Sequence, residues 1–128
     1  MKPTVLIAED DRVLSQLLSV RLRKIGFEVV VAFDAMQAFM VALRMAPAAI
    51  LLDINMPGGT GMQVLKKLKN STKTSHIPVI VLSGSVHPDV GELAKQLGAE
   101  EFFSKPADFE LVQALLERLV APAVRVAS

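Results

Sequence analysis

Acidic, hydroxyl and basic side chains follow short apolar runs at several points along this chain. In chain order they are Glu9, Asp10 and Asp11 after the first run, Asp53 after the third, Ser83 and Gly84 after the fourth, and Lys105 after the fifth. Carboxylates brought within a few ångström repel one another strongly unless a cation lies between them, and Mg²⁺ prefers oxygen ligands. These residue types therefore predict a magnesium site, provided that the fold brings the carboxylates together.

Ser83 and Lys105 add a hydroxyl donor and a fixed positive charge to the same set. Such groups, beside a metal ion, form a cradle for a phosphoryl group. A carboxylate that attacks an activated phosphoryl group becomes an acyl phosphate, and a metal ion lowers the repulsion between the two anions. Asp53 is therefore the predicted acceptor of a phosphoryl group.

The apolar runs themselves predict strands. They are nearly continuous rather than alternating, which is typical of strands that are covered on both faces. The five runs are Thr4–Ala8, Glu28–Ala32, Ala48–Leu52, Pro78–Leu82 and Glu101–Ser104. Between them, apolar residues recur at three-to-four spacing, as at Leu14, Leu18 and Leu22, and predict amphipathic helices. Gly26 and Gly98 predict the ends of two of these helices.

This alternation of strands and helices predicts an α/β fold, a doubly wound parallel sheet of five strands with five helices. Right-handed crossovers carry each helix back over the sheet. Sites in such sheets lie beyond the carboxyl ends of the strands, near the point where the strand order reverses. The polar residues described above follow these strand ends, so we expect them to converge on one edge.

Length and composition limit the alternatives. A chain of 128 residues fits one domain, and 52% apolar residues can build a substantial core. The absence of cysteine excludes disulfides. The first residues show no secretion signal and no apolar run is long enough to cross a membrane, so we expect a soluble, cytoplasmic protein. A net charge of +1 gives no electrostatic reason to expect nucleic-acid binding.

The order and spacing of the polar residues resemble a known family. The nine-residue motif Asp-Ile-Asn-Met-Pro-Gly-Gly-Thr-Gly begins at Asp53, Ser83 lies thirty residues after Asp53, and Lys105-Pro106 follows the fifth strand. With the acidic pair after the first strand, this set resembles the receiver domains of two-component response regulators, chemotaxis regulators among them. The resemblance covers residues 4–120. It implies a flavodoxin-like sheet of strand order 2-1-3-4-5, with a receiver domain over residues 1–120, a short tail at 121–128 and no output domain.

The resemblance implies a role for each residue of the expected site. The metal ligands are Glu9, Asp10, Asp53 and the backbone carbonyl of Asn55; the phosphate-binding residues are Ser83, Gly84 and Lys105; the switch residues are Ser83 and Phe102. Asp53 is the implied phosphoacceptor, assisted by Ser83 and Lys105. The implied cofactor is Mg²⁺, with Mn²⁺ as an alternative. A cis bond is implied at Lys105-Pro106, and Asn55 and Ser85 are expected to tune dephosphorylation.

The implied function is a phosphorylation-dependent switch in a two-component signal transduction system. A histidine kinase or phosphotransfer protein donates the phosphoryl group to Asp53. The face of the fourth helix, fifth strand and fifth helix then changes, around Val90, Leu93 and Phe102, and acts on a downstream protein or an attached output domain. No enzymatic activity is expected beyond the chain's own phosphoryl transfer and slow autodephosphorylation. A monomer or weak dimer is expected, either alone or as part of a longer protein.

Two alternatives belong to other functional classes. Phosphatases of the haloacid-dehalogenase type also form an aspartyl phosphate, but they carry the motif Asp-x-Asp-x-Thr after the first strand. Here the nucleophile candidate follows the third strand, and Asn55 takes the second acidic position. A degenerate receiver would act as a phosphate-independent binding module and would be marked by loss of an acid or the lysine. The chain retains both, and an assay of phosphoryl uptake separates that module from the switch.

The remaining polar and sulfur-containing residues have structural explanations. Asp11, directly before a predicted helix, is expected to cap it. The other expectations are a core position for Met36, Phe39, Met40 and Met45, surface positions for His76 and His87, and a solvated basic face at Lys66, Lys67, Lys69 and Lys73. None of these residues is assigned to a site.

Overall fold

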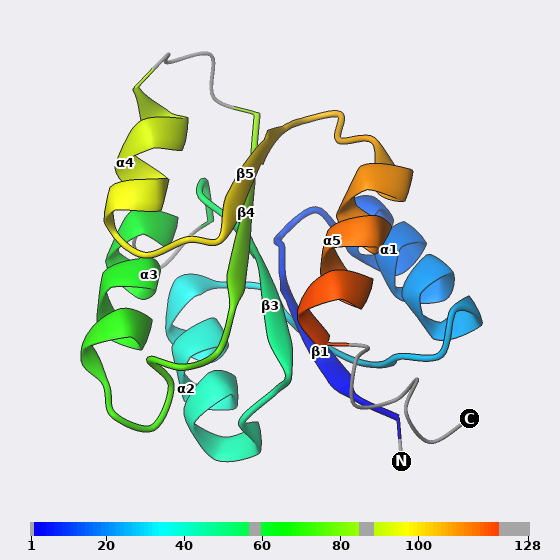
Figure 1. Cartoon of the computed structure of the whole chain (residues 1–128), viewed down its shortest axis with the longest axis horizontal. Helices are drawn as coiled ribbons and strands as arrows, with labels where there is room; N and C mark the ends of the chain where they lie inside the picture. Colours follow the sequence, from blue (N-terminus) through cyan, green and yellow to red (C-terminus); the bar gives the residue numbers. More distant parts are fainter. Residues whose placement is uncertain (1, 57–59, 85–88, 121–128) are drawn as a thin grey trace.

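The computed structural model describes residues 2–56, 60–84 and 89–120, and in this part of the chain five strands alternate with five helices (Figure 1). The strands are β1 (Thr4–Ala8), β2 (Glu28–Ala32), β3 (Ala49–Asp53), β4 (Val79–Ser83) and β5 (Glu101–Ser104). The helices are α1 (Arg12–Lys24), α2 (Ala35–Met45), α3 (Gly61–Asn70), α4 (Val90–Gln96) and α5 (Phe109–Val120). The predicted α/β class is confirmed.

All paired strands run parallel, in the order β2-β1-β3-β4-β5. Helices α1 and α5 cover one face of the sheet, and α2, α3 and α4 cover the other (Figure 1). The chain moves outward from β1 to β2 and then returns to place β3 on the other side of β1, so the strand order reverses between β1 and β3. The carboxyl ends of these two strands are the place where a site is expected.

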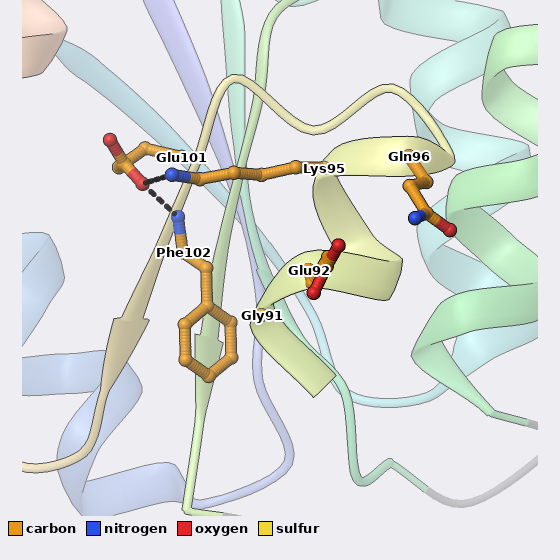
Figure 2. A pocket seen from close by; sticks show the side chains of 6 residues that line it. All are labelled: Gly91, Glu92, Lys95, Gln96, Glu101 and Phe102. Carbon is orange, nitrogen blue, oxygen red and sulfur yellow. Dashed lines mark hydrogen bonds and ion pairs between the residues drawn. The ribbon is translucent and has the colours of Figure 1, made fainter. Parts of the chain in front are cut away.

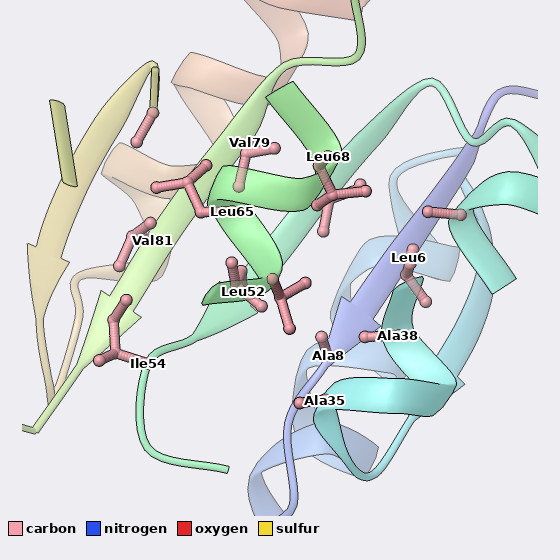
Figure 3. Close-up of a cluster of buried hydrophobic side chains, with 14 of the residues drawn as sticks. Leu6, Ala8, Ala35, Ala38, Leu52, Ile54, Leu65, Leu68, Val79 and Val81 are labelled. Atoms are coloured by element: carbon pink, nitrogen blue, oxygen red, sulfur yellow. The ribbon is translucent and has the colours of Figure 1, made fainter. Parts of the chain in front are cut away.

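Two apolar layers hold the helices against the sheet. Every residue of β3 and β4 is buried, as the continuous apolar runs predict. Figure 3 shows the layer beneath α2 and α3, where Leu65 and Leu68 of α3 point toward the central strands. Helix α2 instead turns the small side chains of Ala35 and Ala38 toward β1. The two helices therefore pack on the sheet with side chains of very different size.

Local residues explain where the helices begin and end. The side chain of Asp11 accepts hydrogen bonds from the backbone N–H groups of Val13 and Leu14, which confirms its expected capping role. Gly26 and Gly98 follow α1 and α4 with φ of 102° and 110°, a backbone conformation that favours glycine. Both glycines thus lie at predicted helix ends.

Strands β3 and β4 each end one residue later than the apolar runs predict. Asp53 pairs in register with Leu82, and Ser83 with Ser104, so the polar residues are the last of their strands. The strand ladder fixes their backbones, because hydrogen bonding continues as far as Ile54 N–H to the carbonyl of Leu82. Both side chains are consequently held by the sheet rather than by a loop.

The core position predicted for three methionines of α2 is wrong. Met36, Met40 and Met45 are 73%, 49% and 50% exposed. The alanines of α2 occupy the side that faces the sheet, so the methionines project outward. Phe39, predicted with them, is partly buried and packs against the core.

The basic residues of α3 do not all form a solvated face. Lys66, Lys67 and Lys73 are exposed as predicted, and so is His76, whereas His87 lies outside the described residues. Lys69 is partly buried and donates hydrogen bonds to the carbonyls of Ser75 and Ile77 at 3.2 and 2.8 Å. Burial lowers the pKa of Lys69, against the opposing charge of Glu100. Lys69 therefore stabilises the connection between α3 and β4 through these hydrogen bonds, and its predicted place on a solvated face is wrong.

Within residues 2–56, 60–84 and 89–120, no helix combines the length and the hydropathy that a membrane span requires.

Candidate functional site

The predicted polar residues meet at the carboxyl edge of the sheet. Glu9 directly follows β1, Asp53 ends β3, Ser83 ends β4 and Lys105 directly follows β5. These four positions belong to strands that are neighbours in the sheet, although they are spread over almost a hundred residues of the chain. The predicted convergence on one edge is therefore present.

Three carboxylates form an acidic cluster at this edge. Glu9, Asp10 and Asp53 each offer an oxygen atom, and these atoms lie within 4.8 Å of one another. Glu9 and Asp53 are only 2% and 3% exposed, whereas Asp10 is exposed. Oxygen donors at this separation suit a hard divalent cation such as Mg²⁺. The donor set thus fits the predicted metal.

Lys105 lies between the two buried carboxylates. Its ammonium Nζ donates a hydrogen bond to Oε1 of Glu9 at 2.6 Å and lies 3.5 Å from Oδ2 of Asp53. Lys105 is itself partly buried. A positive charge with little access to solvent is thereby fixed beside Asp53, where it interacts more strongly than at an exposed position.

Burial and charge change the proton affinity of this pair. Burial raises the pKa of Glu9 to about 7, helped by the charge of Asp53 and opposed by hydrogen bonds from Lys105 and from the backbone N–H of Asp11. Burial disfavours the charged form of Lys105, but its hydrogen bond to Glu9 and the charge of Asp53 outweigh this and raise its pKa. Lys105 accordingly keeps its positive charge at neutral pH.

The start of α3 packs closely against the backbone at the end of β3. Oδ1 of Asp53 accepts a hydrogen bond from the N–H of Asn55 at 3.1 Å, which orients the carboxylate and leaves Oδ2 toward Lys105. The N–H of Gly61 donates to the carbonyl of Ile54 at 2.7 Å. A Cβ atom at Gly61 would lie 2.6 Å from the backbone oxygen of Asp53, so glycine is required there by close approach.

The other predicted residues lie around this centre. Ser83 is fully buried, Gly84 beside it is exposed, and Asn55 is exposed after β3. Lys105-Pro106 is a cis bond, as the resemblance implied. Ser85 lies outside the described residues.

Phe102 lies on the next strand, away from the acidic cluster. It is partly buried on β5, and its ring contacts the backbone of α4 at Gly91, where a Cβ atom would lie 2.9 Å from the ring (Figure 2). Lys95 of α4 forms an ion pair with Glu101 of β5 at 2.8 Å, and the same carboxylate accepts the N–H of Phe102. Helix α4 and strand β5 therefore share a hollow of about 620 Å³ in which the ring is the largest apolar group.

Comparison with known proteins decides the family. Residues 5–117 match the family model of the response regulator receiver domain. The chain belongs to the response regulator receiver family. These domains are signalling modules of two-component systems and bind Mg²⁺ at an acidic pocket; the cluster of Glu9, Asp10 and Asp53 is a pocket of this kind.

Curated relatives of this receiver domain are longer proteins. The DNA-binding dual master transcriptional regulator RpaA of Synechocystis is 31% identical over 125 residues, which are 91% of this chain and 50% of RpaA. The phosphate regulon transcriptional regulatory protein PhoB of Pseudomonas aeruginosa is 31% identical over 103 residues, 80% of this chain and 45% of PhoB. The chain thus spans about half the length of these relatives.

Solved receiver domains have the same fold. A chemotaxis response regulator of Vibrio cholerae has a TM-score of 0.84 and 27% identity, covering 93% of this chain and 99% of its own. The receiver domain of a sensor histidine kinase from Pseudomonas aeruginosa has a TM-score of 0.85 and 25% identity, covering 94% of this chain and 99% of its own. That structure has a magnesium ion coordinated in its active site cleft.

Sequence reasoning missed two features of this receiver domain. The ion pair between Glu9 and Lys105 joins residues 96 positions apart, and no local pattern indicates that Glu9 is the buried acid of its pair. The contact between Gly91 and Phe102 also lacks a sequence pattern. Gly61, by contrast, is part of the motif that begins at Asp53, and its fixed distance from Asp53 could have indicated the close approach.

Proposed function

We propose that Asp53 accepts a phosphoryl group in a two-component signalling pathway and that the receiver domain thereby switches between two states. The observation that carries this proposal is the position of Lys105, whose ammonium lies between the buried carboxylates of Glu9 and Asp53. A nucleophile in such a place has a fixed cation ready for the charge that a phosphoryl group brings.

The transfer uses groups whose positions are fixed by the sheet. Oδ2 of Asp53 attacks phosphorus, an oxygen–phosphorus bond forms, and the bond to the donor's histidine nitrogen breaks, with its electron pair leaving on the imidazole. The N–H of Asn55 holds Oδ1 and so orients the attacking carboxylate. The ammonium of Lys105 pairs with the phosphoryl oxygens, and the hydroxyl of Ser83 and the small Gly84 complete their binding site.

Metal binding belongs to the same proposal. The residues that would hold Mg²⁺, or Mn²⁺ in its place, are Glu9, Asp10, Asp53 and the backbone carbonyl of Asn55. When bound, the ion supplies positive charge that offsets the repulsion between the carboxylate and the phosphoryl oxygens. Burial raises the pKa of Glu9, and a cation beside this carboxyl group would lower that pKa and favour the carboxylate that binds it.

The switch residues we propose are Ser83 and Phe102, with the output face on α4, β5 and α5. Ser83 is paired in register with Ser104 of β5. A shift of Ser83 toward a phosphoryl oxygen therefore displaces β5, the strand that carries Phe102. The ring in turn contacts α4 through Gly91. We propose a histidine kinase or phosphotransfer protein as the donor of the phosphoryl group, and a downstream protein or an attached domain as the target of the switch. We further propose that the receiver domain spans residues 1–120, acts in the cytoplasm and is a monomer or weak dimer.

The intact mass of the protein tests the acceptor directly. After incubation with acetyl phosphate and Mg²⁺, we expect one added phosphoryl group in the wild type and none in Asp53→Asn or in the presence of a chelator. Asp89→Asn is the matched control, because Asp89 precedes α4 without making a side-chain cap and should be phosphorylated normally. Uptake by the Asp53→Asn variant would exclude Asp53 as the acceptor. No uptake by a folded wild type would favour a phosphate-independent binding module. There would then be no phosphoryl group for slow autodephosphorylation to remove.

A further inference from the structure

The groove between α2 and α3 is a surface that phosphoryl transfer does not use. It is a hollow of about 280 Å³ on the outer side of these two helices. Its walls are Met36, Phe39 and Met40 from α2 with Gln63, Val64 and Lys67 from α3. Both helices pack on the same face of the sheet (Figure 1). The groove shares no lining residue with the α4–β5 hollow.

Helix α2 is apolar on both sides. Nine of its eleven residues are apolar, and its inner side is already filled by Ala35 and Ala38 against the sheet (Figure 3). The exposed Met36 and Met40 lie one turn apart on the outer side. A surface helix ordinarily carries polar residues opposite its buried stripe, and a helix that is apolar all round is ordinarily covered. The outer side of α2 therefore has the composition of a surface that another element covers.

The two helices that form the groove carry positive charge and no negative charge. Neither α2 nor α3 contains an acidic residue, and Arg44, Lys66 and Lys67 are exposed on them. Within the described part of the chain, none of these three cations lies within ion-pair distance of a carboxylate. The Nζ atom of Lys67 lies 5.8 Å from the centroid of the Phe39 ring, at the edge of the apolar floor. Lys67 thus places positive charge at the groove, and no carboxylate of the described residues forms an ion pair with it.

We infer that the groove bordered by Met36, Met40 and Lys67 docks an acidic amphipathic helix of a partner protein. Apolar side chains spaced three and four residues apart on that helix fill the hollow, and flexible methionine side chains adapt to their shape. Acidic side chains on its flank pair with Lys67 and Arg44 and select the orientation of docking. The inference does not depend on phosphorylation of Asp53.

Charge and shape argue against other occupants. Two copies of this face would bring cations together in a symmetric contact, because neither helix supplies an acid. A membrane surface favours an apolar face that protrudes between lipid head groups, whereas Phe39 and Val64 lie recessed in a groove. Nucleic acid requires a denser array of cations than the three exposed basic side chains of these two helices.

A pair of synthetic helical peptides tests the inference. Both carry leucines at helical spacing; one has glutamates on the flanks and the other has lysines at the same positions. Each is titrated into protein labelled with ¹³C on the methionine methyl groups, where Met36 and Met40 report on the groove and the buried Met56 is the internal control. The acidic peptide is expected to shift Met36 and Met40 saturably and to leave Met56 unchanged.

Substitutions at exposed positions then test the contacts without disturbing the core. Lys67→Glu is expected to weaken the acidic peptide by about tenfold and to strengthen the basic one. Lys73→Glu is the matched control, an exposed lysine outside the groove, and should change affinity by less than about twofold. Asp53→Asn should bind the acidic peptide like the wild type, which separates this surface from the phosphorylation site.

Four outcomes would overturn the inference. They are equal binding of the two peptides, an unchanged affinity in Lys67→Glu, shifts of Met36 and Met40 with anionic vesicles but not with peptide, and shifts of these methyl groups on concentrating the protein alone. The third would assign the face to a membrane surface and the fourth to a second copy of the chain. Thermal unfolding of each variant confirms that a loss of binding is not a loss of the fold.

Discussion

Glu9 occupies the least favourable environment of any carboxyl group at the site. It is almost fully buried, next to a second buried carboxylate, and its direct charged partner is Lys105. Burial of an ionised group costs free energy unless hydrogen bonds and opposite charge compensate it. Burial outweighs these compensating interactions and raises the pKa of Glu9.

The stability of the metal-free protein should therefore depend on pH through Glu9. Its pKa is about 7 in the folded state against 4.5 for the free side chain, so between these values the folded protein holds a proton that the unfolded chain has lost. The free energy of unfolding should fall as pH rises from 4.5 to 7, on the order of 1–3 kcal/mol. Urea unfolding in the presence of a chelator measures this change.

The matched variant for this measurement is Glu9→Gln, which should remove most of the pH dependence in that interval. Glu101 does not interfere, because its hydrogen bond from Lys95 lowers its pKa and its contribution is lost as pH falls below 4.5. An unchanged slope in Glu9→Gln would mean that another group titrates there.

At the scale of elements, Gly61 at the start of α3 lies close against the backbone at the end of β3. Gly61→Ala should move the backbone of Ile54 and Asp53. The added Cβ atom would lie 2.5 Å from the Cα atom of Ile54 and 2.6 Å from the carbonyl oxygen of Asp53. We expect a loss of about 1–3 kcal/mol in unfolding free energy and a large loss of phosphoryl uptake. Gly84→Ala is the control for the unfolding free energy, since its Cβ atom would meet no neighbour within 4 Å. Equal losses of unfolding free energy in the two variants would refute the steric argument.

Helix α4 and strand β5 are coupled by a different glycine. Gly91→Ala should push the ring of Phe102 away from α4, because the new Cβ atom would lie 2.9 Å from the ring. The aromatic resonances of Phe102 should shift, while phosphoryl uptake at Asp53 stays near the wild-type level. Glu92→Ala, one residue along the same helix, is exposed and should leave these resonances in place. A normal Phe102 spectrum in Gly91→Ala would show that the ring does not need this space.

Most of the strands and helices were predictable from the sequence, because the pattern of their apolar residues shows which sides are buried. Strands buried on both faces are continuous apolar runs, and their ends placed Asp53 and Ser83 within one residue of the observed strand ends. The prediction of which side of α2 is buried was wrong, because both its alanines and its methionines recur at helical spacing. Spacing alone does not tell which side meets the sheet. The pairing of Glu9 with Lys105 depends on the fold of the whole chain.

At the scale of the whole molecule, the last two helices are unequally anchored to the sheet. Helix α5 buries Val112, Leu115 and Leu116 against one face. On the other face α4 has seven residues, all of them described, and Ala94 is its one buried residue. Strand β5, at the edge of the sheet, has no fully buried residue. Regions with few buried contacts open locally at lower free energy than the core, so α4 and β5 are suited to change conformation while β1, β3 and β4 hold the site.

Hydrogen exchange should reveal this division. Amides of β3 are expected to exchange through global unfolding, and those of α4 through local opening. Leu116→Ala removes a fully buried side chain on the face opposite α4 and should lower global stability by about 2–5 kcal/mol. It should therefore accelerate exchange in β3 by a corresponding factor and leave α4 nearly unchanged. If α4 amides accelerated as much as those of β3, the helix would be part of the same cooperative unit, and a switch confined to α4 and β5 would require global rearrangement.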